Sequence, residues 1–179
     1  QGIHKLPPGS ILTLNHGSKE VGVESYWSMK GVVETALSNP FKGTDGQALS
    51  ELESILSNSI SDQMTSDVPL GAFLSGGIDS STIVALMQSQ SVNRIKTFTI
   101  GFNEKGYDEA RHAKDVARHL GTEHTELYVT SSQAMDVIPR LPAMFDEPFA
   151  DSSQIPTYLV SKLAKQRVDV SLSGDGGDE

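Results

Sequence analysis

The chain has 179 residues, of which 37% are hydrophobic and 21% are charged, so it is long enough for a globular domain and too apolar for a disordered one. Asp and Glu number 23 against 14 for Lys and Arg, and the net charge of −9 argues against a nucleic-acid backbone or an anionic membrane as a partner. Cysteine is absent, which excludes disulfides, thiolate metal sites and a cysteine nucleophile within these residues. There is no apolar run of about 18 residues and no signal-peptide pattern, so we expect a cytoplasmic protein.

The first 47 residues are predicted to form a hairpin followed by a linker. Residues 11–14 (ILTL) and 23–27 (VESYW) are predicted strands on either side of a turn at NHGSKE. Gly, Pro and Asn in residues 38–47 indicate a linker. The chain opens without Met and stops inside the glycine-rich SGDGGDE, so we expect it to be part of a longer protein.

From residue 49 onward the pattern predicts strands alternating with helices. Apolar residues recur every three or four positions over 49–64, which is typical of an amphipathic helix. Short apolar runs predict four strands, at 68–74, 95–102, 123–129 and 168–172. Further helices are predicted after the first strand and over 108–121, where Gly121 is the expected C-cap. Residues 131–145 are predicted to begin as a helix that Pro139 and Pro142 bend or end. A last helix is predicted over 151–166, with Ser152 or Ser153 as N-cap and Pro156 in its first turn. This alternation predicts an α/β fold, a doubly wound parallel sheet with helices on both faces.

The segment LSGGIDSS, residues 74–81, links the first of these strands to a helix. Ligands of such sheets bind beyond the carboxyl ends of the strands. Gly76 and Gly77 allow positive φ and a close approach of the backbone to a ligand. The N-terminus of the following helix favours an anion, and the serine hydroxyls add donors. The segment therefore predicts a phosphate-binding loop.

Asp79 is unexpected in such a loop, because a carboxylate repels a phosphate. The loop lacks the lysine of a Walker A motif, so it is a different phosphate loop. Mg²⁺ binds one or two carboxylates together with phosphate oxygens, and Asp178 or Asp175 in LSGDGGDE, after the last strand, is expected to supply the second one. The alternative is an ordinary turn in which Asp79 stabilises the first turn of a helix. The matching Leu-Ser-Gly at the end of two strands favours the metal.

Five segments carry a resemblance to a known family: LSGGIDSS, TFTIGF, YDEARHAKDVARHLGTEH, DEPFADSS and LSGDGGDE. The first resembles the PP-loop, S-G-G-x-D-S-[ST], of ATP pyrophosphatases, and the set resembles the synthetase domain of glutamine-hydrolysing asparagine synthetases. The resemblance covers nearly the whole chain. It implies that residues 1–37 are the tail of the glutaminase domain with a connector, and that residues 38–179 are the N-terminal part of the ATP-dependent synthetase domain. The glutaminase nucleophile and a catalytic lysine of the family lie outside these residues, so we expect the chain alone to be inactive.

The resemblance also implies a reaction, with ATP and Mg²⁺ required. Aspartate attacks the α-phosphorus of ATP, and β-aspartyl-AMP forms as pyrophosphate is released. Ammonia derived from glutamine then attacks the acyl carbon and gives asparagine and AMP. Asp175 stands where many members carry Glu. The roles implied for single residues are pyrophosphate binding by Ser75, Gly76, Gly77, Asp79 and Ser80, adenosine contacts by Leu74 and Ile100, a border of the nucleotide at Ser173 and Gly174, Mg²⁺ ligation by Asp79 and Asp178, a catalytic role at the acyl centre for Asp175, and an acceptor pocket shaped by Asp151 and Ser152.

Two other interpretations remain open. A different PP-loop ligase, such as a β-lactam-forming synthetase or an NAD synthetase, shares the ATP chemistry but amidates or cyclises another acceptor. A nucleotide-binding or interaction module without turnover is the non-enzymatic alternative, although both acids, Asp79 and Asp178, are intact. The expected partners are small molecules, neither nucleic acid nor membrane, and the oligomeric state is open, with a homodimer as one option.

Overall fold

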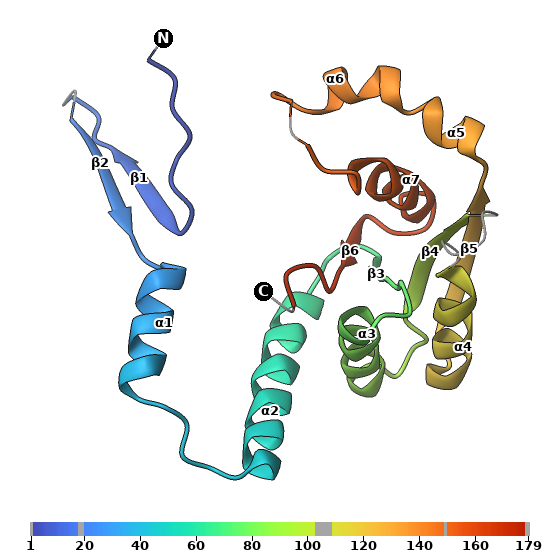
Figure 1. Ribbon diagram of the computed structural model, residues 1–179, viewed down its shortest axis with the longest axis horizontal. Helices are drawn as coiled ribbons and strands as arrows, with labels where there is room; N and C mark the ends of the chain where they lie inside the picture. Colours follow the sequence, from blue (N-terminus) through green and yellow to red (C-terminus); the bar gives the residue numbers. More distant parts are fainter. Residues whose placement is uncertain (1, 18–19, 103–108, 149, 178–179) are drawn as a thin grey trace. The chain divides into compact units, whose positions relative to one another are not determined.

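The computed structural model describes residues 2–17, 20–102, 109–148 and 150–177 (Figure 1). The chain divides into two compact units, Gln1–Glu51 and Leu52–Glu179, which are described separately. Within the described residues, none of the helices is both long enough and apolar enough to cross a membrane.

The first unit contains the predicted hairpin and a helix that the sequence pattern did not predict. β1 (Ser10–Leu14) pairs antiparallel with β2 (Val21–Ser25), close to the predicted bounds. α1 (Met29–Ser38) begins where the Ser28 hydroxyl accepts a hydrogen bond from the Gly31 N–H at 3.1 Å. The predicted linker therefore shortens to residues 39–44, before α2 (Asp45–Met64) begins.

The second unit is built on a four-stranded parallel sheet with the order β5-β4-β3-β6. Its elements after α2 are β3 (Leu70–Phe73), α3 (Ile78–Gln90), β4 (Lys96–Phe102), α4 (Ala110–Leu120), β5 (Glu123–Val129), α5 (Ser131–Met135), the 3-10 helix η1 (Ile138–Arg140), α6 (Leu141–Met144), α7 (Gln154–Ala164) and β6 (Val170–Leu172). The four predicted strands are all present, and the region with Pro139 and Pro142 breaks into short helices as expected.

Helices cover both faces of this sheet, which confirms the predicted doubly wound α/β class (Figure 1). Alternate residues of β3 face opposite layers, because successive side chains of a strand point to opposite sides. Ala72 packs in a core with residues of α2, α3 and α4, while Phe73 packs against α7 on the other side. Phe98 of β4 is completely buried in this second core.

The strand order reverses between β3 and β6. The chain leaves β3 for β4 on one side of the sheet and returns to β6 on the other, with Ala72 opposite Leu172. Such a reversal opens a crevice at the carboxyl ends of the strands. The two loops meet there, because a Cβ on Gly174 would lie 2.8 Å from the backbone nitrogen of Ser80. Only a glycine fits at 174 without moving one of the loops.

The loop after β3 is held in place by α4. Gly76 has a φ of +83° and lies so close to α4 that a Cβ would be 2.6 Å from the Ala113 nitrogen. Gly77 has a φ of −72°, and its Cβ would meet only the Ser75 hydroxyl, at 3.3 Å. Of the two glycines expected to permit positive φ, Gly76 has it and Gly77 does not.

This difference gives a test of the packing. We expect Gly76→Ala to lower the free energy of unfolding by roughly 1–3 kcal/mol, because it combines a left-handed backbone with a contact to the backbone of α4. The matched control Gly77→Ala should stay within about 0.5 kcal/mol of the wild type. Urea unfolding followed by circular dichroism measures both, and equal losses in the two variants would contradict the observed loop conformation.

Candidate functional site

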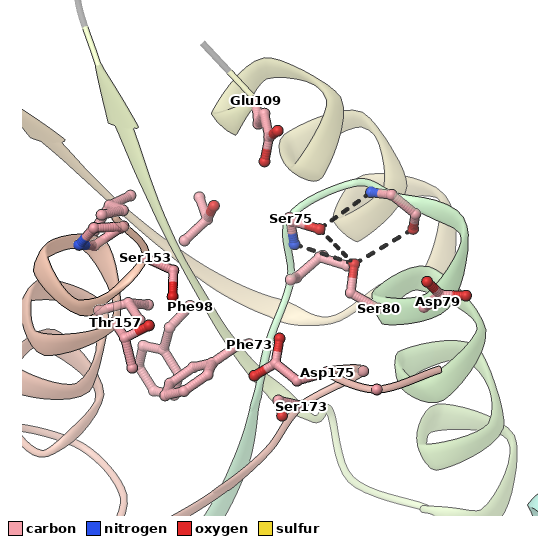
Figure 2. A pocket seen from close by; sticks show the side chains of 18 of the residues that line it. Phe73, Ser75, Asp79, Ser80, Phe98, Glu109, Ser153, Thr157, Ser173 and Asp175 are labelled. Atoms are coloured by element: carbon pink, nitrogen blue, oxygen red, sulfur yellow. Dashed lines mark hydrogen bonds between the residues drawn. The ribbon is translucent and has the colours of Figure 1, made fainter. Parts of the chain in front are cut away.

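A cavity of about 680 Å³ opens at the carboxyl ends of the parallel strands (Figure 2). Its walls come from the residues that follow β3 and β6, from β4, and from the N-terminal ends of α4 and α7. The volume lies within the range of about 300–1,000 Å³ found for small-molecule sites. The cavity therefore occupies the position that the strand reversal predicts for a ligand.

Two serine hydroxyls organise the loop after β3. The Ser80 Oγ accepts a hydrogen bond from the Ser75 N–H at 3.2 Å and donates to the Gly77 carbonyl at 3.3 Å (Figure 2). The Ser75 Oγ accepts from the Gly77 N–H at 3.3 Å and lies 2.9 Å from the Ser80 Oγ. Both loop N–H groups thus point at oxygen acceptors inside the loop. A phosphate oxygen would offer the same donors a charged and stronger acceptor.

The N-terminus of α3 adds to this donor set. Gly77 is the N-cap of α3 and has no side chain to cap it, so within the described residues the first N–H groups of the helix lack a side-chain cap. α3 is 13 residues long, and its dipole favours negative charge at this end. Loop and helix together form a binding surface for an anion with several oxygens.

The charged side chains of the cavity oppose an anion. Asp79, Glu109, Asp151 and Asp175 line it, and no Lys, Arg or His does so among the residues that the structure describes. A polyanionic ligand must therefore be neutralised by a cation that comes with it. The donors fit such a role, because carboxylate oxygens are hard ligands suited to Mg²⁺.

Asp79 is the acid in contact with both loops. It lies in the first turn of α3, and a Cβ on Gly177 would be 3.1 Å from its Cγ. In the described part of the chain, no cluster of three or more Asp, Glu, His or Cys side chains could hold a metal by itself. This fits Mg²⁺, which is bound by one or two carboxylates and completes its shell with ligand oxygens and water.

Most of the site residues expected from the sequence lie together. Gly76 is not among the lining residues because it faces α4, and Ser152 is replaced in the lining by its neighbour Ser153. Asp178 lies outside the described residues. The expected residues that line the cavity are Leu74, Ser75, Gly77, Asp79, Ser80, Ile100, Asp151, Ser173, Gly174 and Asp175.

Asp151 is held in a fixed orientation at the start of α7. The backbone N–H and the hydroxyl of Ser153 donate to its two carboxylate oxygens, each at 2.8 Å, and lower the pKa of Asp151. Ser153 is the residue before α7, as expected, but its side chain makes no capping bond to the helix. The prediction of Ser152 or Ser153 as N-cap is therefore confirmed at Ser153, although its hydroxyl bonds to Asp151 and not to the helix.

Several lining residues were missed by the sequence pattern. Phe73 and Phe98 were read only as strand residues, and the register that turns them toward α7 comes from the sheet. Glu109 lay inside a predicted helix, where nothing indicated that it would face the cavity. The missed residues are Phe73, Phe98, Thr99, Glu109, Ser153, Pro156, Thr157, Val160 and Gly176.

One solved structure aligns with this chain at low similarity. The NMN synthetase of Francisella tularensis aligns with a TM-score of 0.49 and 16% identity, over 68% of this chain and 52% of that chain. Values this low add nothing to the fold that the sheet order already establishes.

Comparisons of the amino-acid sequence with those of known proteins give much higher similarity than this structural alignment. Asparagine synthetase (glutamine-hydrolyzing) 1 of Bacillus subtilis is 35% identical over 177 residues, which cover 99% of this chain and 27% of that protein. Putative asparagine synthetase (glutamine-hydrolyzing) 2 of Methanocaldococcus jannaschii is 43% identical over 132 residues, which cover 73% of this chain and 25% of that protein. The chain thus spans about a quarter of the length of these relatives. The family model for asparagine synthase matches residues 51–179, and with it the loops of the cavity, so the chain belongs to the asparagine synthase family.

Proposed function

We propose that the chain provides the ATP-binding part of an enzyme that amidates aspartate to asparagine. The observation that carries this proposal is the meeting of the Ser75–Ser80 loop and the loop after β6 in one cavity at the strand reversal. Residues 38–179 would form the N-terminal part of the synthetase domain, and residues 1–37 the end of a glutaminase domain with its connector. A cytoplasmic location belongs to the same proposal.

The loop would bind the phosphates that leave as pyrophosphate. The N–H groups of Ser75 and Gly77 and the hydroxyls of Ser75 and Ser80 point at acceptor positions within the loop. Negative charge grows on the pyrophosphate as its bond to the α-phosphorus breaks. Fixed N–H donors and the α3 N-terminus stabilise that charge without reorganising during the reaction.

Asp79 would hold Mg²⁺, with Asp178 as the proposed second ligand. When bound, the metal would offset the charge of the triphosphate in a cavity whose described side chains include four acids and no base. The carboxylate of Asp79 lies against Gly177, so it stands where the two loops meet. This position lets one side chain connect the phosphate loop to the loop after β6.

The nucleoside would lie along β3 and β4. The backbone N–H of Leu74 donates to the Phe98 carbonyl at 3.0 Å, which fixes the start of the loop against β4. Leu74 and Ile100 are proposed to contact adenosine, and Ser173 and Gly174 to border the nucleotide. Phe73, with the buried Phe98 packed behind it, supplies an apolar wall on the α7 side that suits a purine ring.

The chemical steps follow from the proposed family activity. The side-chain carboxylate of aspartate attacks the α-phosphorus, the bond to pyrophosphate breaks, and β-aspartyl-AMP forms. Ammonia, released from glutamine elsewhere in the protein, then attacks the acyl carbon and AMP leaves. Asp175 lies in the same cavity as the phosphate loop and is proposed to act at the acyl centre. Asp151, with Ser152 beside it, is proposed to shape the acceptor pocket.

Metal dependence tests the site in the 179-residue chain. We expect ATP to bind in Mg²⁺, and Asp79→Asn to weaken this binding by about tenfold or more, because one metal ligand is lost. In EDTA the same substitution should leave ATP affinity unchanged or raise it, since a repelling carboxylate is gone. Calorimetry measures both affinities.

The matched control for this experiment is Asp115→Asn, which removes an exposed acid on α4 that pairs with Arg118 outside the cavity. It should leave ATP affinity unchanged under both conditions. Equal ATP affinity with and without Mg²⁺ in the wild-type chain would contradict the proposed role of Asp79.

Product analysis of the complete protein tests the reaction. We expect AMP and pyrophosphate to form together and only when aspartate is present, with ammonium able to replace glutamine. The loop lacks the Walker lysine that would reach the β- and γ-phosphates, which is why ADP is not the expected product. ADP and phosphate would overturn the proposed role of the loop. AMP formed with another carboxylate, as a β-lactam-forming synthetase would give, would overturn the proposed substrate.

A further inference from the structure

Glu109 is placed at the cavity by the packing of α4. It precedes the helix with helical dihedral angles, and its backbone carbonyl accepts from the Ala113 N–H at 3.1 Å. Ala113 is completely buried, and its nitrogen is the atom that a Cβ on Gly76 would contact. The phosphate loop and the start of α4 therefore form one packed unit, and the Glu109 side chain lines the cavity beside that loop.

Within the part of the chain that the structure describes, the carboxylate of Glu109 makes no contact that stabilises the fold. It makes no capping hydrogen bond to α4, although it occupies the N-cap position. Among the residues that the structure describes, it has no hydrogen-bond or ion-pair partner. Other acids near this helix do have partners: Asp115 pairs with Arg118 at 2.9 Å, and Glu126 with Lys114 at 2.9 Å. The carboxylate is exposed at the cavity, so it is open to hydrogen-bond donors of a ligand bound there.

Glu109 is separated from the proposed metal position. Figure 2 shows the Glu109 side chain at the start of α4 and the Asp79 side chain at the start of α3, and the two do not point toward one another in this view. We therefore infer that an ion held by Asp79 is not shared with Glu109. A carboxylate also repels the phosphates themselves. The group that meets Glu109 must carry hydrogen-bond donors and must lie next to the phosphates.

The ribose of a nucleotide meets both conditions. It is joined directly to the α-phosphate, and its two hydroxyls are donors that a carboxylate can accept together. Thr99 lies on the same face of β4 as Gly101, whose Cβ would touch Ala110 of α4, so a second polar group lines this side of the cavity. The apolar wall of Phe73 and Phe98, suited to the base, is on the opposite face.

We propose that Glu109 binds the ribose hydroxyls of the nucleotide and makes the site selective for ribonucleotides over deoxyribonucleotides. The proposal rests on the proposed function, because it takes the ligand of the phosphate loop to be ATP. Glu109 is then a specificity residue outside the set that holds pyrophosphate and metal. It acts on the sugar from α4, while the phosphate contacts come from the loop and α3.

The test compares the dissociation constants of ATP, 2′-deoxy-ATP and 3′-deoxy-ATP, measured by calorimetry in Mg²⁺ on the 179-residue chain. We expect the wild type to prefer ATP over at least one analogue by about tenfold, and Glu109→Ala to reduce that preference to near one. The readout is the ratio of the dissociation constants of each analogue and ATP. Removing any acid changes the electrostatic attraction for all three triphosphates alike, so this ratio isolates the contact with the sugar. The preference of Glu109→Gln for ATP should lie between those of the wild type and Glu109→Ala, because its amide oxygen accepts a hydrogen bond but carries no charge.

The control Asp115→Ala removes an acid from the same helix outside the cavity and should keep the full preference. A wild type that binds all three nucleotides equally, or a Glu109→Ala variant that keeps the preference, would overturn the role of Glu109 and leave the nucleotide site intact. A wild type that binds no ATP would overturn the proposed function and this inference with it. Circular dichroism verifies folding, and if Glu109→Ala does not fold, Glu109→Gln carries the comparison.

Discussion

The site depends on one close backbone contact, between Gly174 after β6 and the first turn of α3. There is no room for a side chain at 174, because a Cβ would lie 2.8 Å from the Ser80 nitrogen. Parallel pairing of β3 with β6 brings the two loops out of the sheet as neighbours, and this contact then locks them together. On the opposite side of the phosphate loop, Gly76 makes a similar contact with α4. The positions of Ser75, Asp79 and Asp175 follow from these two contacts.

In the cavity, the backbone attracts anions and the charged side chains repel them. Attraction for an anion comes from N–H groups and from the α3 dipole, while the charged side chains that line the described cavity are all acidic. Such a site would bind a bare polyphosphate poorly and a metal-bound one well. It would also leave each carboxylate free for a separate part of the ligands, as we propose for Asp79 at the metal, Glu109 at the sugar and Asp175 at the acyl group.

The sequence predicted the second unit well because apolar runs and helical periodicity are local signals. It also located the loop, since glycines and serines that directly follow a buried strand and precede a helix are typical of an anion-binding turn. The helix α1 was missed although Met29, Val32, Val33 and Leu37 recur at helical spacing and Ser28 was a readable cap. Which glycine takes positive φ, and that Glu109 faces the cavity, depend on how α4 packs on the loop, and a pattern along the chain does not carry that information.

The central claim is that the backbone of the loop after β3 binds the phosphates of the ligand. Two-dimensional ¹H–¹⁵N NMR of the 179-residue chain, titrated with inorganic pyrophosphate and Mg²⁺, tests it most directly. We expect the largest amide shifts at Ser75, Gly77, Ser80 and Gly174, around the contact between the two loops. Unchanged amide signals at these residues, with the shifts concentrated on another surface, would contradict it.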